Sequence, residues 1–332
     1  MKKRIILILT SCFLIISLLT SCSTTAAAEK QNVIGIAWRS DEDSEFYTNI
    51  CKAIEDAGGT WVKLEQVKSA DLSYNELGRL TEGVDENGAL DMEASKSVRL
   101  NTWHDSNAAS ALKDISFVIF TGGEDISSYL FFTPEVWHGI AEEKDYNAER
   151  DVSDFLTMSY CLDNDIPFIG MCRGLQMLAV VSGSEMIQDI PTFFDEKDLP
   201  YAFEHRNQKE TPSSYRDYSS HPVIVEKGSR LYDIVKTETL EGCPSWHHQA
   251  TKDVSNTRLS VTGYTPTSGI DMIEALERTD KTFAVGIQFH PEAAVVKHLE
   301  NAENKDKYMD YEKARSFFTY IVDAVSSDSF SK

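Results

Sequence analysis

The segment Gly170-Met171-Cys172-Arg173-Gly174 constrains the fold of this chain more than any other feature. An apolar run, 166–169, precedes it and predicts a buried strand, and residues 175–180 predict a buried helix. A glycine two residues on each side of a nucleophile, between a strand and a helix, is typical of a nucleophile elbow, here with cysteine in place of serine. Cβ atoms at the glycine positions would collide with neighbouring backbone in so tight a turn. The Cys172 sulfur would then lie at a helix N-terminus, where free N–H groups favour a thiolate.

The other cysteines carry no comparable context. A buried core position is the usual fate of an isolated cysteine, and we weigh it against catalysis for Cys172. Cys51 and Cys161 lie in apolar helical patterns without nearby glycines and are expected in the core, and Cys243 is expected in a loop. No spacing resembles a disulfide framework or a zinc site.

A nucleophilic thiol needs a base, and His290 is the candidate. It follows the apolar run 283–289, which predicts a core strand, and open α/β sheets place their chemistry at strand ends. Glu292 follows two residues later, close enough to accept a hydrogen bond from the imidazole. A solvated turn is the alternative for a histidine and a glutamate at this spacing.

Paired glycines, Gly122 and Gly123, follow another predicted strand, 115–120. Such a turn can direct backbone N–H groups into a cleft, where they would stabilise an oxyanion. The N–H of Arg173, directly after the nucleophile, would be the second donor. An ordinary strand-terminating turn is the alternative.

Four motifs together resemble a known family. In chain order they are Thr121-Gly122-Gly123-x-Asp125, Gly170-x-Cys172-Arg173-Gly174-x-Gln176, Ser245-x-His247-His248-Gln249 and Gln288-x-His290-Pro291-Glu292. This order is similar to that of class I glutamine amidotransferase-like hydrolases, in particular γ-glutamyl hydrolases of peptidase family C26 of the γ-glutamyl-γ-aminobutyrate hydrolase type. The resemblance extends over residues 33–322.

The resemblance implies a role for each matching residue. Cys172 would be the nucleophile, His290 the base and Glu292 its partner. The main-chain N–H groups of Gly123 and Arg173 would form the oxyanion hole. The implied substrate-binding residues are Gly122, Gln176, His247, His248 and Gln249. The implied chemistry uses no metal and no cofactor.

The adjacent histidines His247 and His248 raise the question of a metal site. Neighbouring residues of a strand point in opposite directions, and no third ligand follows at a spacing typical of zinc. We therefore expect a pocket-lining loop and no metal. His205 and His221 also match positions of the family, without a role that the sequence explains.

The N-terminus predicts export. Lys2-Lys3-Arg4 precedes an apolar run, 5–19, and Leu19-Thr20-Ser21 precedes Cys22. This pattern resembles a bacterial lipoprotein signal peptide, residues 1–21, with lipidation of Cys22 and a polar tether, 22–32. The predicted location is the extracytoplasmic face of the cell membrane, held by the lipid anchor alone. A plain signal peptide or an uncleaved anchor is the alternative.

The net charge of the chain limits the classes of molecule that it is expected to bind. The chain carries a net charge of −21, and residues 1–21 contain three basic and no acidic side chains, so the processed chain would carry −24. Such a charge disfavours nucleic acid and anionic lipid headgroups as partners. A small γ-glutamyl compound is the expected partner, and the sequence leaves assembly into a homo-oligomer open.

Alternating strand and helix patterns predict one α/β domain over residues 33–325, followed by a short tail, 326–332. We expect a mostly parallel central sheet flanked by helices, of the class I glutamine amidotransferase-like (flavodoxin-like) type, with a nucleophile elbow. Residues 69–114 form an atypical acidic insertion, expected to be solvated, with a lid or an interface as alternatives.

The expected function is cysteine-dependent hydrolysis of γ-glutamyl amides, through a γ-glutamyl thioester, to glutamate and an amine. Three alternatives remain open. The chain could be a glutaminase subunit that supplies ammonia, a hydrolase of folate polyglutamates or poly-γ-glutamate, or a non-catalytic binding lipoprotein.

Overall fold

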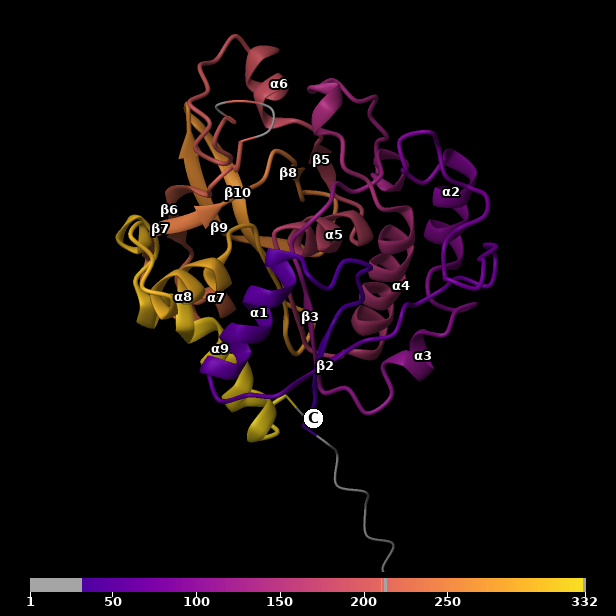
Figure 1. Cartoon of the computed structure of the whole chain (residues 1–332), viewed down its shortest axis with the longest axis horizontal. Coiled ribbons are helices and arrows are strands. Elements are labelled where there is room, and N and C mark those ends of the chain that lie inside the picture. Colours follow the sequence, from indigo (N-terminus) through magenta and orange to yellow (C-terminus); the bar gives the residue numbers. More distant parts are fainter. Residues whose placement is uncertain (1–31, 210, 212–213, 331–332) are drawn as a thin grey trace, which may run out of the picture. The chain divides into compact units, whose positions relative to one another are not determined.

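One nine-stranded sheet forms the centre of the structure, a computed structural model that describes residues 32–209, 211 and 214–330 (Figure 1). Its strand order is β2-β1-β3-β4-β11-β10-β9-β6-β7. The strands of this sheet are β1 (Ile34–Ile36), β2 (Trp61–Lys63), β3 (Phe117–Phe120), β4 (Phe168–Met171), β6 (Ser219–Val225), β7 (Thr239–Ser245), β9 (Leu259–Thr267), β10 (Ile270–Arg278) and β11 (Ala284–Ile287). A separate short pair joins β5 (Glu185–Ile187) and β8 (Ala250–Asp253).

Helices cover both faces of the sheet. On one face lie α1 (Glu45–Asp56), α7 (Arg230–Val235), α8 (Pro291–Leu299) and α9 (Tyr311–Ser326). On the other lie α2 (Met92–Asn101), α3 (Ala108–Ala111), α4 (Ala148–Asn164) and α5 (Arg173–Val181). A further helix, α6 (Ile190–Asp195), packs in a smaller apolar cluster with residues of β5, β8 and β10.

The sequence dictates the parallel half of the sheet. β1, β3, β4 and β11 are fully buried runs of mainly apolar residues, as expected for parallel strands covered by helices on both faces. The five strands from β2 to β11 pair in parallel. The expected α/β class with a mostly parallel sheet and flanking helices is confirmed.

The other half of the sheet was not anticipated. β10, β9, β6 and β7 pair antiparallel, so β10 and β6 run against all other strands of the sheet. This half includes Cys243, which lies buried on β7 rather than in the expected loop. The free cysteines Cys51 and Cys161 are buried in helices, as expected.

Residues 69–114 differ from the expected solvated insertion. Leu90 and Val98 are fully buried, and α2 and α3 both pack against α4. The segment is polar on its outer side because only one face of it meets the core. The insertion therefore extends one helical layer of the domain.

The predicted signal peptide, Cys22 and nearly all of the tether lie outside the described residues. Within residues 32–330, apart from the few undescribed positions near 212, no helix combines the length and apolar character needed to cross a membrane.

Candidate active site

Cys172 occupies a sharp turn between β4 and α5. Its backbone has φ 52° and ψ −104°, a conformation that non-glycine residues adopt rarely and that elbows impose on their nucleophile. A Cβ on Gly170 would collide with the backbone of Gly174, so the turn requires glycine there. The expected elbow is thus present, with the thiol at the N-cap of α5.

The register of β11 on β4 brings the second motif to the thiol. Ile287 pairs with Met171, and the Cys172 N–H donates to the Ile287 carbonyl at 2.8 Å. The chain then turns so that His290 is the residue just before α8 and Glu292 lies in the first turn of that helix. His290 Nδ1 lies 2.6 Å from Glu292 Oε1, and both side chains are fully buried.

His290 lies directly beside Cys172. A Cβ added to Gly122 would be 2.7 Å from His290 Cε1 and 3.5 Å from Cys172 Cβ, so only glycine leaves room for both. Burial lowers the pKa of His290, but Glu292 and the Cys172 thiol outweigh it and raise that pKa to about 10. The structure therefore brings Cys172, His290 and Glu292 together in an arrangement that favours an imidazolium beside the sulfur.

Two buried arginines donate hydrogen bonds to the carbonyl groups of the Gly122-Gly123 turn. Arg150 Nη2 donates to the carbonyls of Thr121 and Gly122, both at 2.9 Å, and Arg39 Nη1 donates to the Gly122 carbonyl at 3.0 Å. With its carbonyls held on that side, the turn can present N–H groups to the cleft, and Gly123 lines the cleft together with Cys172. Sequence reasoning did not assign this role to Arg39 or Arg150.

The Arg173 side chain points away from the cleft. It is fully buried and pairs with Asp151 at 2.5 Å and with Asp154. Its backbone N–H, in the first turn of α5, has no acceptor within that helix. The position suits the expected main-chain role, while the side chain fixes α5 against α4.

The expected substrate-binding residues line one cleft with Cys172: Gln176, His247, His248 and Gln249. Gln176 Nε2 donates to the Gln249 carbonyl at 2.9 Å, and Gln249 Oε1 accepts from the Ile126 N–H at 3.2 Å. These bonds fix the 246–249 loop against α5 and the segment after β3. Gly122 contributes by its closeness to the thiol and the imidazole.

The two adjacent histidines face different partners. His248 lies between Asp125, 2.8 Å from Nε2, and Asp189, 3.0 Å from Nδ1. Burial lowers the pKa of His248, yet these two carboxylates raise it above its ordinary value. His247 turns its Nε2 toward the buried Glu274, 3.5 Å away, where His205 and His221 also converge.

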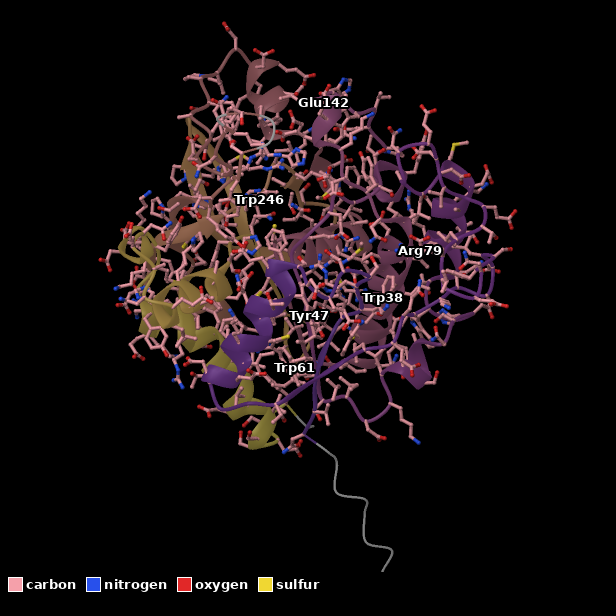
Figure 2. All side chains as sticks on the ribbon, in the orientation of Figure 1. Trp38, Tyr47, Trp61, Arg79, Glu142 and Trp246 are labelled. Atoms are coloured by element: carbon pink, nitrogen blue, oxygen red, sulfur yellow. The ribbon has the colours of Figure 1, made fainter. Side chains whose placement is uncertain are left out.

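Arg206 was not singled out from the sequence as a site residue, although it lines the cleft. Its guanidinium stacks 4.3 Å from the Trp246 ring centroid and lies 3.0 Å from Glu143. Its Nε and Nη1 atoms are buried and make no hydrogen bond of good geometry within the described residues. Trp246 also lines the cleft, and Figure 2 labels it in the upper part of the view. The same part of the view labels Glu142, which lines a second cavity that adjoins the cleft. The pair His205-Arg206 matches the family in sequence, but that match assigned no role to the arginine.

Comparison with known proteins identifies a family that agrees with the four sequence motifs. The model of the peptidase C26 family matches residues 88–292, more than half of the chain, with all four motifs inside. A γ-glutamyl-γ-aminobutyrate hydrolase of Escherichia coli O157:H7 is 31% identical over 159 residues, 48% of this chain and 59% of that protein. Protein NtpR of Enterococcus hirae is 28% identical over 187 residues, 56% of this chain and 70% of that protein.

The chain thus spans less than two thirds of the length of the Escherichia coli hydrolase that it matches. A solved glutamine amidotransferase from Thermotoga maritima aligns with 90% of this chain and 98% of its own, at 15% identity and a TM-score of 0.45, a likeness too distant to indicate an activity. The family match covers the elbow, the glycine turn and the His290–Glu292 motif in one stretch. The chain therefore belongs to the peptidase C26 family of hydrolases.

Proposed function

We propose that this chain hydrolyses γ-glutamyl amide bonds through a thioester on Cys172. The observation that carries the proposal is the elbow cysteine beside a buried His290–Glu292 pair, at the bottom of a cleft. An acyl-transfer nucleophile needs an adjacent base that a third group orients, and these three residues meet that requirement.

The reaction would follow two steps. The Cys172 sulfur attacks the γ-carbonyl carbon, and N–H groups at Gly123 and Arg173 stabilise the oxyanion. As the C–N bond breaks, His290 passes its proton to the leaving amine. A water molecule, deprotonated by His290, then attacks the thioester carbon, and glutamate leaves as Cys172 is restored.

The charges in the cleft support a γ-glutamyl group, which carries one carboxylate and one ammonium on the same carbon. Arg206 forms an ion pair with Glu143, and its Nε is buried without a hydrogen-bond partner among the described residues, so Nε is a donor suited to the carboxylate. Asp125 and Asp145 line the same cleft and would attract the ammonium. Burial and the neighbouring Glu124 and Asp125 raise the pKa of Asp145, so a nearby cation would be favourable there.

A larger cavity of about 620 Å³ adjoins the cleft and shares Glu143, Arg206 and His248 with it. Tyr201 and Phe203 supply apolar walls, and further acidic residues contribute to the lining. We propose that this cavity receives the leaving group, an amine with apolar surface.

A substrate panel tests the proposal. The purified protein would be incubated with γ-glutamyl derivatives of aliphatic amines, amino acids and oligoglutamate, and with glutamine, and glutamate release would be measured by mass spectrometry. We expect release from γ-glutamyl amines and a γ-glutamyl adduct on Cys172. Ammonia from glutamine only in the presence of a partner would instead favour a glutaminase subunit, and oligoglutamate as the preferred substrate would favour the polyglutamate alternative. No turnover and no adduct would favour a binding protein.

We further propose that the protein is exported and anchored by lipid at Cys22. This proposal depends on the sequence pattern of residues 1–22 alone.

A further inference from the structure

Behind the catalytic cleft, three histidines and one glutamate converge at a single buried point. They are His205, His221, His247 and Glu274, and none is more than 4% exposed. One potential ligand atom from each lies within 4.8 Å of every other. We propose that these four side chains form a closed site for a divalent transition-metal ion of the zinc type.

The distances suit one ion. Glu274 Oε1 lies 3.1 Å from His205 Nδ1, 3.5 Å from His247 Nε2 and 3.8 Å from His221 Nε2. Tetrahedral zinc with ligands at about 2.0–2.1 Å sets neighbouring ligand atoms ~3.4 Å apart. The three distances from Glu274 are close to this value, and every other pair of ligand atoms lies within 4.8 Å, so small side-chain shifts would fit the four atoms around one ion.

The atoms that point inward lack other partners. His205 Nδ1, His221 Nε2, His247 Nε2 and both Glu274 carboxylate oxygens are buried, and among the described residues none makes a hydrogen bond of good geometry. Five such atoms around one point would be costly to bury, because a carboxylate needs compensation in an apolar interior. One cation would serve as the partner of all four side chains.

The opposite ring nitrogens are already held. His205 Nε2 lies 2.8 Å from Thr267 Oγ1, His221 Nδ1 lies 3.1 Å from Thr265 Oγ1, and His247 Nδ1 lies 2.9 Å from the Gln249 carbonyl. Metal-binding histidines usually have such a second partner, which fixes the ring orientation and leaves the other nitrogen free for the ion.

The backbone also directs the ligands inward. The β9–β10 register shifts between Ile273 and Ala275, which places Glu274 at a bulge, and the β6–β7 register shifts just after His221. Bulges re-aim side chains at functional positions. Sequence spacing predicted no metal because the four ligands come from separate segments between residues 205 and 274.

An ion here would hold the substrate cleft in shape. The His205 carbonyl accepts from the His247 N–H at 3.0 Å and from Ser245 Oγ at 2.8 Å, so the two segments already meet at this point. The neighbours of these two histidines line the cleft. They are Arg206, which follows His205, and Trp246 and His248, which flank His247. With four protein ligands and no open position, the role would be structural rather than catalytic.

The test uses metal alone and does not depend on the proposed hydrolase activity. The full chain would be treated with chelator, titrated with Co²⁺, and read by visible absorption. Bound Zn²⁺ would be measured by elemental analysis in a parallel sample. We expect one ion per chain, a tetrahedral Co²⁺ spectrum without a thiolate charge-transfer band, displacement by Zn²⁺, and a Zn²⁺-dependent rise in Tm.

Variants locate the ion. His221→Gln and Glu274→Gln should each lose the stoichiometric binding and the Tm rise. His138→Gln, at an exposed histidine, and Cys172→Ala should keep both. Absence of binding by the wild-type chain would overturn the proposal even if the cluster variants fail to fold. So would a thiolate band, loss of binding in Cys172→Ala, or unchanged binding in a folded His221→Gln.

Discussion

Replacing Glu292 by glutamine removes one charge from the buried pair at the centre of the site. Glu292 Oε1 lies 2.6 Å from His290 Nδ1, and neither side chain contacts solvent. The amide has nearly the same shape, but it can donate its N–H to Nδ1, which would shift the imidazole proton to Nε2. His290 could then no longer accept a proton at the nitrogen nearest the substrate side.

The structure sets the expected magnitude. Although burial opposes it, Glu292 followed by Cys172 raises the pKa of His290 from 6.5 to about 10. At about 1.36 kcal/mol per pKa unit, the rise corresponds to on the order of 5 kcal/mol in favour of the imidazolium. Since the charge of Glu292 is the largest single favourable contribution, we expect Glu292→Gln to lower kcat by about 10³- to 10⁴-fold.

The assay is steady-state hydrolysis of a chromogenic γ-glutamyl anilide from pH 5 to 10, with stability measured by denaturant titration over the same range. A folded-state pKa above the ordinary value gives stability that is fully present below pH 6.5 and is lost as the pH rises toward about 10. In Glu292→Gln this decline should be smaller.

The matched control is Glu300→Gln, just after the same helix, where the glutamate is exposed and pairs with exposed Lys52. It should change neither kcat nor the pH dependence. A Glu292→Gln enzyme with kcat within threefold of the wild type would refute the role of the pair. An unchanged decline of stability with pH would refute the charge argument.

Four further outcomes are expected. Cys172→Ala should lower hydrolysis by at least about 10⁴-fold with an unchanged circular dichroism spectrum, and near-normal turnover would remove the elbow cysteine from the mechanism. Arg206→Gln should raise KM about 10- to 100-fold with little change in kcat, and an effect on kcat alone would contradict a binding role. Arg150→Met should cost about 3–5 kcal/mol in urea unfolding because it removes a buried cation that pairs with Glu124 and with buried Asp154, whereas exposed Arg79→Met should cost under about 1 kcal/mol, and equal costs would argue against the buried network. Cys22→Ser should abolish fatty-acid labelling and leave the precursor uncleaved, and labelling that persists would place the anchor elsewhere.

The local features of the site could be predicted from the sequence because they depend on neighbouring residues. Gly170 and Gly174 flank Cys172 between a buried strand and a helix, and no other residue fits where their backbones meet. The apolar runs that became β3, β4 and β11 were recognisable because parallel strands are buried on both faces. Likewise, Glu292 follows His290 by two residues, and that pair formed as expected.

The tertiary structure alone decided which distant segments meet. Parallel pairing of Ile287 with Met171 sets His290 beside the thiol, and this register cannot be read from either segment by itself. The antiparallel half of the sheet brings Glu274 under the cleft, together with His221 and the loops that carry Arg206 and His247. Sequence spacing identifies a site whose residues all lie in one turn or one helix. A site whose residues come from several strands depends on strand order and register, which the packing of the whole core determines.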